Sequence, residues 1–271
     1  VRAARMSAHY GARVATAEDL YMGGTCVNVG CVPKKLFVYA SHFTEEYEQA
    51  QGFGWQKSSP GFDWQVLRDN KDVEIDRLNG VYRGMLESAE VTHFDGRARI
   101  VDAHTISINE RRVSTEKILI ATGSWPFIPD FPGSEYAISS NEVFHLEEFP
   151  KRPVVVGGGY IAVEFAGIFK GLGAESHLLY RGPLFLRKFD DGIRSFVADE
   201  LDKKGIHLHF NTNVTAIEKN ANDTLKVITA EEGELEADLV MYATGRNPAI
   251  HDIGLETVKV DTRADGAIIV D

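Results

Sequence analysis

The pattern of hydrophobic and polar positions changes near residue 153, and the two parts of the chain predict different sets of elements. Residues 63–90 place apolar side chains at near-helical spacing, which predicts a long helix. Residues 91–122 alternate in short apolar and polar runs, which predict a small antiparallel layer that returns to a buried strand at ILIAT, residues 118–122. Two further helices are predicted at residues 1–11 and 25–49, and a short strand at residues 13–17.

The part after residue 153 predicts a βαβ unit with an added layer of strands. Five of the nine prolines lie in residues 123–153, which suggests a linker and a domain boundary. The expected order is a strand at 153–156, a glycine-opened helix at 157–171, a strand at 174–180 and an amphipathic helix at 190–204. Four more strands are predicted at residues 206–210, 214–219, 224–230 and 238–244. The fold class is therefore α/β.

Composition and charge narrow the class of protein. The chain has 271 residues, of which 44% are hydrophobic and 25% charged, as in ordinary globular domains. Its 29 basic and 40 acidic residues give a net charge of −11, which argues against binding to nucleic acid or to an acidic membrane surface. No apolar run approaches the length of a membrane span, and no secretory signal opens the sequence. These features lead us to expect a cytoplasmic protein.

The two cysteines, Cys26 and Cys31, lie five residues apart in GGTCVNVGCVPKK. A disulfide between them closes so small a ring that it stabilises the fold by only about 2 kcal/mol, which favours redox chemistry over a structural bridge. A zinc site needs two further ligands, and neither a second cysteine pair nor a His-x-x-x-His motif is nearby, so no metal site is predicted. Two buried, unreactive thiols are the alternative.

Helix geometry predicts an irregular backbone between the cysteines. Five residues of a regular helix rise about 7.5 Å, which exceeds the Cα separation of about 7 Å that a disulfide tolerates. Gly30 permits the required irregularity. A helix N-terminus near Cys31, followed by Lys34 and Lys35, is expected to lower a thiol pKa and favour reactivity.

A glycine-rich loop predicts a dinucleotide site. VVVGGGYIAVEFAG matches G-x-G-x-x-A at Gly157, Gly159 and Ala162, after a predicted strand and before a predicted helix. Gly157 allows a tight turn, and Gly159 lets the backbone approach a pyrophosphate at the helix N-terminus. The alternative is an ordinary strand-to-helix turn.

The end of the next strand indicates which dinucleotide is bound. An NAD site places an acidic residue there, whereas this strand ends at Tyr180 and is followed by Arg181 and Arg187. Two guanidinium groups without a carboxylate suit the 2′-phosphate of NADPH. Two solvated surface arginines are the alternative.

Together these motifs resemble the flavoprotein disulfide reductases, and within them the glutathione reductases. GGTCVNVGCVPKK resembles the redox-active disulfide segment of the family, and its Pro-Lys-Lys ending is similar to that of glutathione, trypanothione and large thioredoxin reductases. ILIATG and YATGR resemble two short strand-end motifs of the same family. The resemblance implies two Rossmann-like three-layer (ββα) nucleotide-binding domains. The expected boundaries are an FAD domain at 1–146, an inserted NADPH domain at 147–247 and a return to the FAD or central domain at 248–271.

The resemblance also implies roles for individual residues. Cys26 is similar to the thiol that attacks the disulfide substrate, and Cys31 to the thiol beside the flavin. Lys34 and Glu164 resemble an ion pair beside the reactive flavin nitrogen. The positions similar to FAD contacts are Glu18, Thr25, Thr122 and Gly123. The positions similar to NADPH contacts are Gly157, Gly159, Tyr160, Ile161, Arg181, Arg187, Gly245 and Arg246. Tyr160 is also similar to the aromatic gate over the flavin.

Two positions, Arg5 and Tyr82, resemble residues that contact glutathione. Arg5 is equally explained as a solvated charge on a helix, and Tyr82 as a core residue at helical spacing. The resemblance implies FAD and NADPH as cofactors and glutathione disulfide as the substrate. Trypanothione or thioredoxin reductase is the alternative within the enzyme class, and a non-catalytic NADPH-binding module is the alternative outside it.

The chain also departs from the family pattern. The family begins with a strand and a GxGxxG loop for FAD, which would precede Val1. It ends with a dimerisation domain that carries an acid/base histidine, which would follow Asp271. We therefore expect a fragment of an enzyme that is a homodimer at full length.

Overall fold

The computed structural model describes residues 1–56 and 61–270, which form two compact units. One unit comprises residues 1–32, 72–125 and those from 246 onward, and the other comprises residues 33–71 and 126–245. The domain boundaries expected at 146 and 247 stay a prediction. No helix among the described residues is long and apolar enough to cross a membrane.

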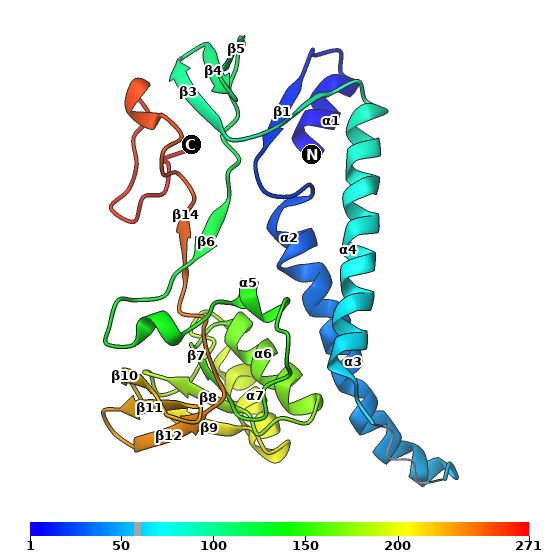
Figure 1. Ribbon diagram of the computed structural model, residues 1–271, viewed down its shortest axis with the longest axis vertical. Coiled ribbons are helices and arrows are strands. Elements are labelled where there is room, and N and C mark those ends of the chain that lie inside the picture. Colours follow the sequence, from blue (N-terminus) through cyan, green and yellow to red (C-terminus); the bar gives the residue numbers. More distant parts are fainter. Residues whose placement is uncertain (57–60, 271) are drawn as a thin grey trace. The chain divides into compact units, whose positions relative to one another are not determined.

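The second unit is built on a parallel sheet of four strands (Figure 1). The strand order is β13 (Leu239–Tyr242), β7 (Pro153–Val156), β8 (His177–Tyr180) and β9 (His207–Phe210). Helix α6 (Tyr160–Gly171) packs on β7 and β8, and helix α7 (Asp191–Lys203) packs on β9. The predicted βαβ unit is therefore confirmed, and the strand predicted at 153–156 has the observed bounds.

An antiparallel layer covers the other face of this sheet. Its strands are β10 (Val214–Lys219), β11 (Leu225–Thr229) and β12 (Gly233–Ala237). Leu179 and Val154 of the parallel sheet share one core cluster with Val227 and Ala237 of this layer, and all four side chains are fully buried. Leu178 on the opposite face is also fully buried, so both faces of the sheet are covered. The sequence did not predict β12, which has only one large apolar residue, in GELEA.

Aromatic side chains hold the helices of the second unit together. Helix α3 (Cys31–Ala50) contributes Phe37, which is fully buried and lies 5.0 Å from the Trp64 ring and 5.5 Å from the Phe144 ring. Phe144 in turn lies 5.5 Å from Phe165 of α6. This chain of rings packs α3 against α6. The smaller elements of this unit are η1 (Gln51–Phe53), η2 (Ser134–Tyr136) and α5 (Ser140–Val143).

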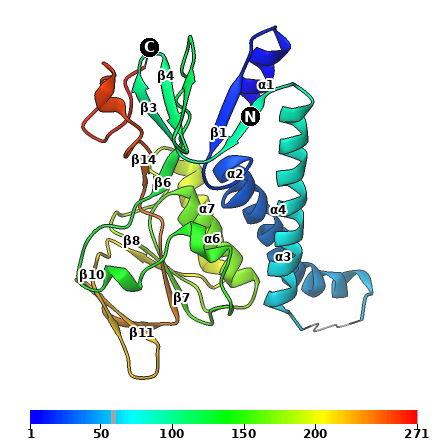
Figure 2. The same cartoon turned by 45° about the horizontal axis from the view of Figure 1, so that its top comes forward.

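The first unit combines short helices with three small sheets. Strand β1 (Ala15–Glu18) pairs in parallel with β2 (Thr92–Asp95), and β3 (Ala98–Asp102), β4 (Thr105–Ile108) and β5 (Arg111–Ser114) form an antiparallel sheet (Figure 2). The third sheet pairs β6 (Ser124–Pro126) with β14 (Arg246–Pro248). The remaining elements are α1 (Arg2–His9), α2 (Gly24–Asn28), η3 (Leu255–Thr257) and α4 (Trp64–Glu87), whose first turns belong to the second unit.

Three predicted elements differ from the structure. The single helix expected at 25–49 is two helices, α2 and α3, separated at residues 29–30. Strand β2, expected in the antiparallel layer, instead pairs in parallel with β1. The buried strand expected at 118–122 is absent: no described strand pairs with it, and Leu119 is 73% exposed. A strand needs a partner for its backbone groups, and apolar composition alone does not supply one.

Candidate functional site

The glycine loop joins β7 to α6 and has the shape that a pyrophosphate requires. Gly157 has a φ of 153°, and a Cβ there would lie 2.5 Å from the Ala243 carbonyl oxygen. Gly159 is the N-cap of α6, and nothing lies within 4 Å of the place where its Cβ would stand. The backbone is therefore closely packed on one side and open at the helix N-terminus, where an anion is favoured.

The Tyr180 ring fixes the beginning of the next loop. A Cβ on Gly158 would lie 2.2 Å from Tyr180 Cε2, and one on Gly182 would lie 2.7 Å from Tyr180 Cε1. Both glycines are therefore needed for the ring to lie against the backbone on either side of it. The contact joins the end of β8 to the glycine loop.

Residues 181–187 form a loop that is held by its main chain; we call it the arginine loop. The Leu186 amide donates to the Gly158 carbonyl at 2.7 Å, which ties this loop to the glycine loop. Arg194 of α7 donates from Nε to the Phe185 carbonyl and from Nη2 to the Leu184 carbonyl, both at 2.8 Å. Arg194 also pairs with Asp191 on the same helix. Its role in holding the loop was not predicted, because the loop carbonyls that it binds leave no signature in the sequence.

The two predicted phosphate readers lie on this loop. Arg181 and Arg187 are both exposed, and neither makes an ion pair with any other residue that the structure describes. Their guanidinium groups are thus available to an incoming phosphate, on a loop that is fixed beside the glycine loop.

Substituting Arg194 with alanine is expected to weaken NADPH binding about tenfold, because the loss of two charge-assisted hydrogen bonds loosens the arginine loop. Titration of NADPH by fluorescence measures the dissociation constant. Lys203→Ala is the matched control, since Lys203 lies on the same helix and pairs with Glu200, three residues earlier on it. Equal affinities in the Arg194 variant and the control would contradict this role.

Four further residues are predicted to contact NADPH. Tyr160, Ile161 and Gly245 belong to the second unit, and Arg246 belongs to the first. Tyr160 is the first residue of α6 and is 59% exposed, while Ile161 is half-buried beside it. Gly245 has a φ of 149°, and its carbonyl accepts from the Phe127 amide at 3.0 Å. Arg246 donates from Nε to Ser124 Oγ at 2.9 Å. The cofactor roles of these four residues stay predictions.

The structure brings Lys34 and Glu164 together, 130 residues apart in sequence. Lys34 Nζ donates to Glu164 Oε1 at 2.7 Å, with 27% and 33% of the two side chains exposed. Lys34 lies in the first turn of α3 and Glu164 in the second turn of α6, so the aromatic packing of these helices positions the pair. Because the pair is partly buried and charge-assisted, the hydrogen bond holds the lysine ammonium group in one position.

The two cysteines lie on either side of the break between α2 and α3. Cys26 is within α2, Cys31 is the first residue of α3, and both are exposed, which excludes the buried alternative. The hydrogen bond between the two thiols, and then burial, raises the pKa of Cys26. The lowering expected for a thiol near the helix N-terminus and the lysines is not found at Cys26, and it stays a prediction for the cysteine segment.

The break between the helices depends on Gly30. Conformational freedom of glycine was the expected reason, but the structure shows that close backbone contact is the reason. The φ of Gly30 is not in the left-handed region, but a Cβ there would lie 2.8 Å from the Thr25 carbonyl oxygen and 3.2 Å from Cys26 Cα. Gly30 is thus required because the backbone passes close to Cys26. This close approach brings the two thiols within hydrogen-bonding reach.

Gly30→Ala is expected to lower the free energy of unfolding by about 1–3 kcal/mol, because the contacts of its Cβ are with main-chain atoms that cannot rotate away. Urea unfolding measures this change. Gly52→Ala serves as the control, since nothing lies within 4 Å of a Cβ there and its φ is not positive. A Gly30 variant as stable as the control would show that the backbone relaxes at no cost.

Two asparagines hold the cysteine segment, and the sequence analysis identified neither. The buried Asn28 donates from Nδ2 to the carbonyls of Met22 and Gly24, each at 3.0 Å. Asn79 of α4 donates to Asn28 Oδ1 at 2.9 Å. Amide side chains bonded to backbone in this way fix the path of α2 ahead of the helix break.

The residues predicted to contact FAD lie at element ends of the first unit. Glu18 ends β1, and its Oε1 accepts from the amides of Asp19 and Leu20 at 3.1 and 3.0 Å. Thr25 lies half-buried in α2, while Thr122 and Gly123 are exposed. Gly123 has a φ of 74°, and its carbonyl accepts from the Ala249 amide at 3.0 Å.

The two residues predicted to contact glutathione have different surroundings. Arg5 lies half-buried on α1. Tyr82 packs against a core cluster of Met22, Leu86 and Val91, which supports the core interpretation left open by the sequence. Contact of either residue with glutathione stays a prediction.

The fold and the loops define the class of protein first. A parallel βαβαβ sheet with a glycine loop at the first helix N-terminus, and arginines after the second strand, is a Rossmann-type dinucleotide-binding unit. The family model of pyridine nucleotide-disulphide oxidoreductases matches residues 1–271, and the chain belongs to this family.

Several known proteins are similar to the chain. Glutathione reductase from Burkholderia cepacia is 46% identical over the whole chain, which spans 60% of that relative. The chloroplastic/mitochondrial glutathione reductase from Pisum sativum is 45% identical, and the chain spans 51% of its length. Among solved structures, the HOCl-induced flavoprotein disulfide reductase RclA from Escherichia coli matches with a TM-score of 0.86 and 28% identity. That match covers 99% of this chain and 59% of the other.

Proposed function

We propose that the whole protein that contains this chain reduces glutathione disulfide at the expense of NADPH, with FAD as a bound cofactor and Cys26 and Cys31 as the redox pair. The observation that carries the proposal is the pair of exposed thiols on either side of a helix break. Identities of 43–46% to proteins named glutathione reductase support this substrate over trypanothione or thioredoxin.

The residues of the second unit fit NADPH. Gly157 and Gly159 leave the N-terminus of α6 open for the pyrophosphate. Arg181 and Arg187 bind the 2′-phosphate, which has the charge and the acceptor oxygens that two guanidinium groups require. Tyr160 at the start of α6 is exposed enough to move when nicotinamide enters.

The residues of the first unit fit part of FAD. Glu18 uses Oε1 for two backbone amides, which leaves Oε2 for a ribose hydroxyl. Thr25, Thr122 and Gly123 supply further hydroxyl and backbone groups for the flavin nucleotide. When bound, FAD accepts a hydride from NADPH and passes two electrons to the Cys26–Cys31 disulfide.

The two thiols then carry out disulfide exchange. The Cys26 thiolate attacks one sulfur of glutathione disulfide, which forms a mixed disulfide and releases one glutathione thiolate that takes up a proton. The Cys31 thiolate attacks Cys26 Sγ, releases the second glutathione and restores the Cys26–Cys31 disulfide. The two electrons held by the thiols thus end on two glutathione molecules. Lys34, held by its ion pair with Glu164, would supply a fixed positive charge to the reactive part of the flavin when FAD is bound.

The remaining proposals concern partners and compartment. Arg5 offers a cation for the carboxylates of glutathione, and Tyr82 offers a phenol beside it. The whole protein is proposed to be a homodimer. Reduced thiols require a reducing compartment such as the cytoplasm.

An anaerobic titration of the whole protein with NADPH, followed by visible absorption, tests the proposal. We expect a flavin band that declines and a long-wavelength band from a thiolate beside the flavin. Consumption of NADPH with glutathione disulfide is expected to exceed that with trypanothione disulfide or thioredoxin. A colourless protein that still binds NADPH would support a non-catalytic binding module instead.

A further inference from the structure

Three histidines gather on one face of the parallel sheet, and none of them has a part in the proposed reductase reaction. His177 of β8 is the register partner of His207 of β9, and His209 follows two residues later on the same face. The His177 ring stacks on the His207 ring at 4.6 Å and on the His209 ring at 5.3 Å between centroids. Two carboxylates, Glu175 and Glu232, interact with this stack.

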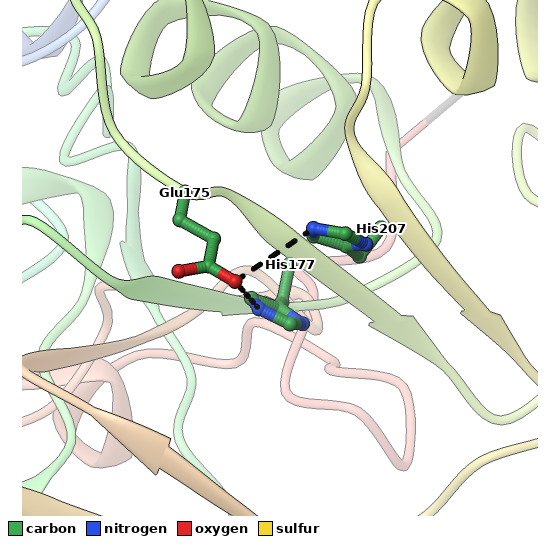
Figure 3. A group of neighbouring side chains, drawn as sticks. All are labelled: Glu175, His177 and His207. Atoms are coloured by element: carbon green, nitrogen blue, oxygen red, sulfur yellow. Dashed lines mark ion pairs between the residues drawn. The ribbon is translucent and has the colours of Figure 1, made fainter.

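Three of these side chains bring ligand atoms close together. Figure 3 shows one carboxylate oxygen of Glu175 beside the stacked rings of His177 and His207, joined by a dashed line to one nitrogen of each. Glu175 Oε1 lies 3.9 Å from His177 Nε2 and 3.9 Å from His207 Nε2. All three ligand atoms lie within 4.8 Å of one another. A tetrahedral metal with ligands at about 2.0–2.2 Å holds them about 3.3 Å apart, so the site closes when the side chains shift by about 0.5–1.5 Å and the two exposed residues, Glu175 and His207, turn toward the metal.

Two hydrogen bonds, one between Glu232 and His209 and one between His209 and His177, orient the ring of His177. With its ring protonated on Nδ1 alone, His209 donates a hydrogen bond to the Glu232 carboxylate and keeps a lone pair on Nε2. In that tautomer His209 Nε2 accepts from His177 Nδ1, which lies 3.0 Å away. This arrangement leaves a lone pair on His177 Nε2, directed toward Glu175. Metal-binding histidines are commonly fixed by such second partners.

We propose that Glu175, His177 and His207 form a binding site for a divalent transition metal, with Zn²⁺ as the best match. Two imidazoles and one carboxylate are a ligand set that zinc accepts, and three protein ligands leave a fourth position for water. No metal site was predicted from the sequence, because no further ligands lie near the two cysteines. His207 lies 30 positions after His177 and comes beside it only through strand pairing.

Isothermal titration of the whole protein with ZnCl₂ tests the site. The protein is prepared without a histidine tag, stripped with a chelator, and kept oxidised so that Cys26 and Cys31 do not bind the metal. We expect one Zn²⁺ per chain at this site. His207→Ala and Glu175→Gln, at exposed positions that leave the core unchanged, are each expected to weaken binding at least tenfold.

A matched histidine variant and a spectroscopic probe complete the test. His42→Ala removes an exposed histidine of α3 and is expected to leave zinc affinity unchanged. Co²⁺ in place of zinc is expected to give visible absorption bands in the wild type that His207→Ala removes. Unchanged affinity in both His207→Ala and Glu175→Gln, or no zinc binding by the wild type, would overturn the proposal. These outcomes do not depend on reductase activity, so they leave the proposed function to its own test.

Discussion

Cys26→Ser is expected to lower the turnover of glutathione disulfide by the whole enzyme at least about a thousandfold, while NADPH still reduces its flavin. A serine hydroxyl at neutral pH does not replace a thiolate as the nucleophile, so no mixed disulfide forms. The electrons then have no route to the substrate. Stopped-flow absorption measures reduction of the flavin, and a steady-state assay measures consumption of glutathione disulfide.

The comparison with Cys31→Ser separates the two thiols. Cys31 begins α3 and is proposed to act on Cys26, so its replacement leaves the attacking thiol in place but prevents release of the second glutathione. A mixed disulfide is therefore expected to accumulate on Cys26, which mass spectrometry detects as one bound glutathione. If flavin reduction and disulfide turnover fall equally in Cys26→Ser, the assigned roles are wrong.

The second large effect is expected for the double variant Arg181→Ala with Arg187→Ala. Each guanidinium is proposed to make a charge-assisted hydrogen bond to the 2′-phosphate, worth about 1.5–3 kcal/mol. Because about 1.4 kcal/mol corresponds to a factor of ten, the preference for NADPH over NADH is expected to fall at least about a hundredfold. The ratio of kcat/KM for the two nucleotides measures the preference.

Arg77→Ala provides a control for the loss of positive charge, because Arg77 is an exposed arginine of α4 that pairs with Glu74. Its NADPH/NADH ratio is expected to stay the same. Activity with NADH is expected to change little in the double variant, since NADH lacks the phosphate that the arginines bind. An unchanged ratio in the double variant would remove the phosphate-binding role.

Local signals were enough to predict the elements that bind the nucleotide. Strand β7 has four apolar residues in succession, the glycine motif follows it directly, and the arginines follow β8. Each of these signals lies within a few residues of sequence, and the structure places each where the pattern indicates. The Lys34–Glu164 pair spans 130 residues and was expected only from the family resemblance.

The features that were missed depend on partners far away in sequence. Residues 118–122 are as apolar as a buried strand, but their state is decided by whether another strand lies beside them. The break at Gly30 arises from close contact with backbone rather than from a turn signal. Arg194, Asn28 and the histidine cluster likewise act on groups that only the folded chain brings near. The composition of the chain and the spacing of its residues do not indicate contacts between residues far apart in sequence.

The arginine loop also bears on how coenzyme preference changes during evolution. The backbone of this loop is positioned by the hydrogen bond of the Leu186 amide and by the hydrogen bonds that Arg194 donates to two loop carbonyls. Its path therefore does not depend on the side chains at 181 and 187. Given the phosphate-binding role proposed for Arg181 and Arg187, substitutions at these two surface positions are expected to alter which nucleotide is recognised without a penalty in folding. A lineage can pass between phosphorylated and unphosphorylated coenzymes by single, separately tolerated steps, and a protein engineer can follow the same path.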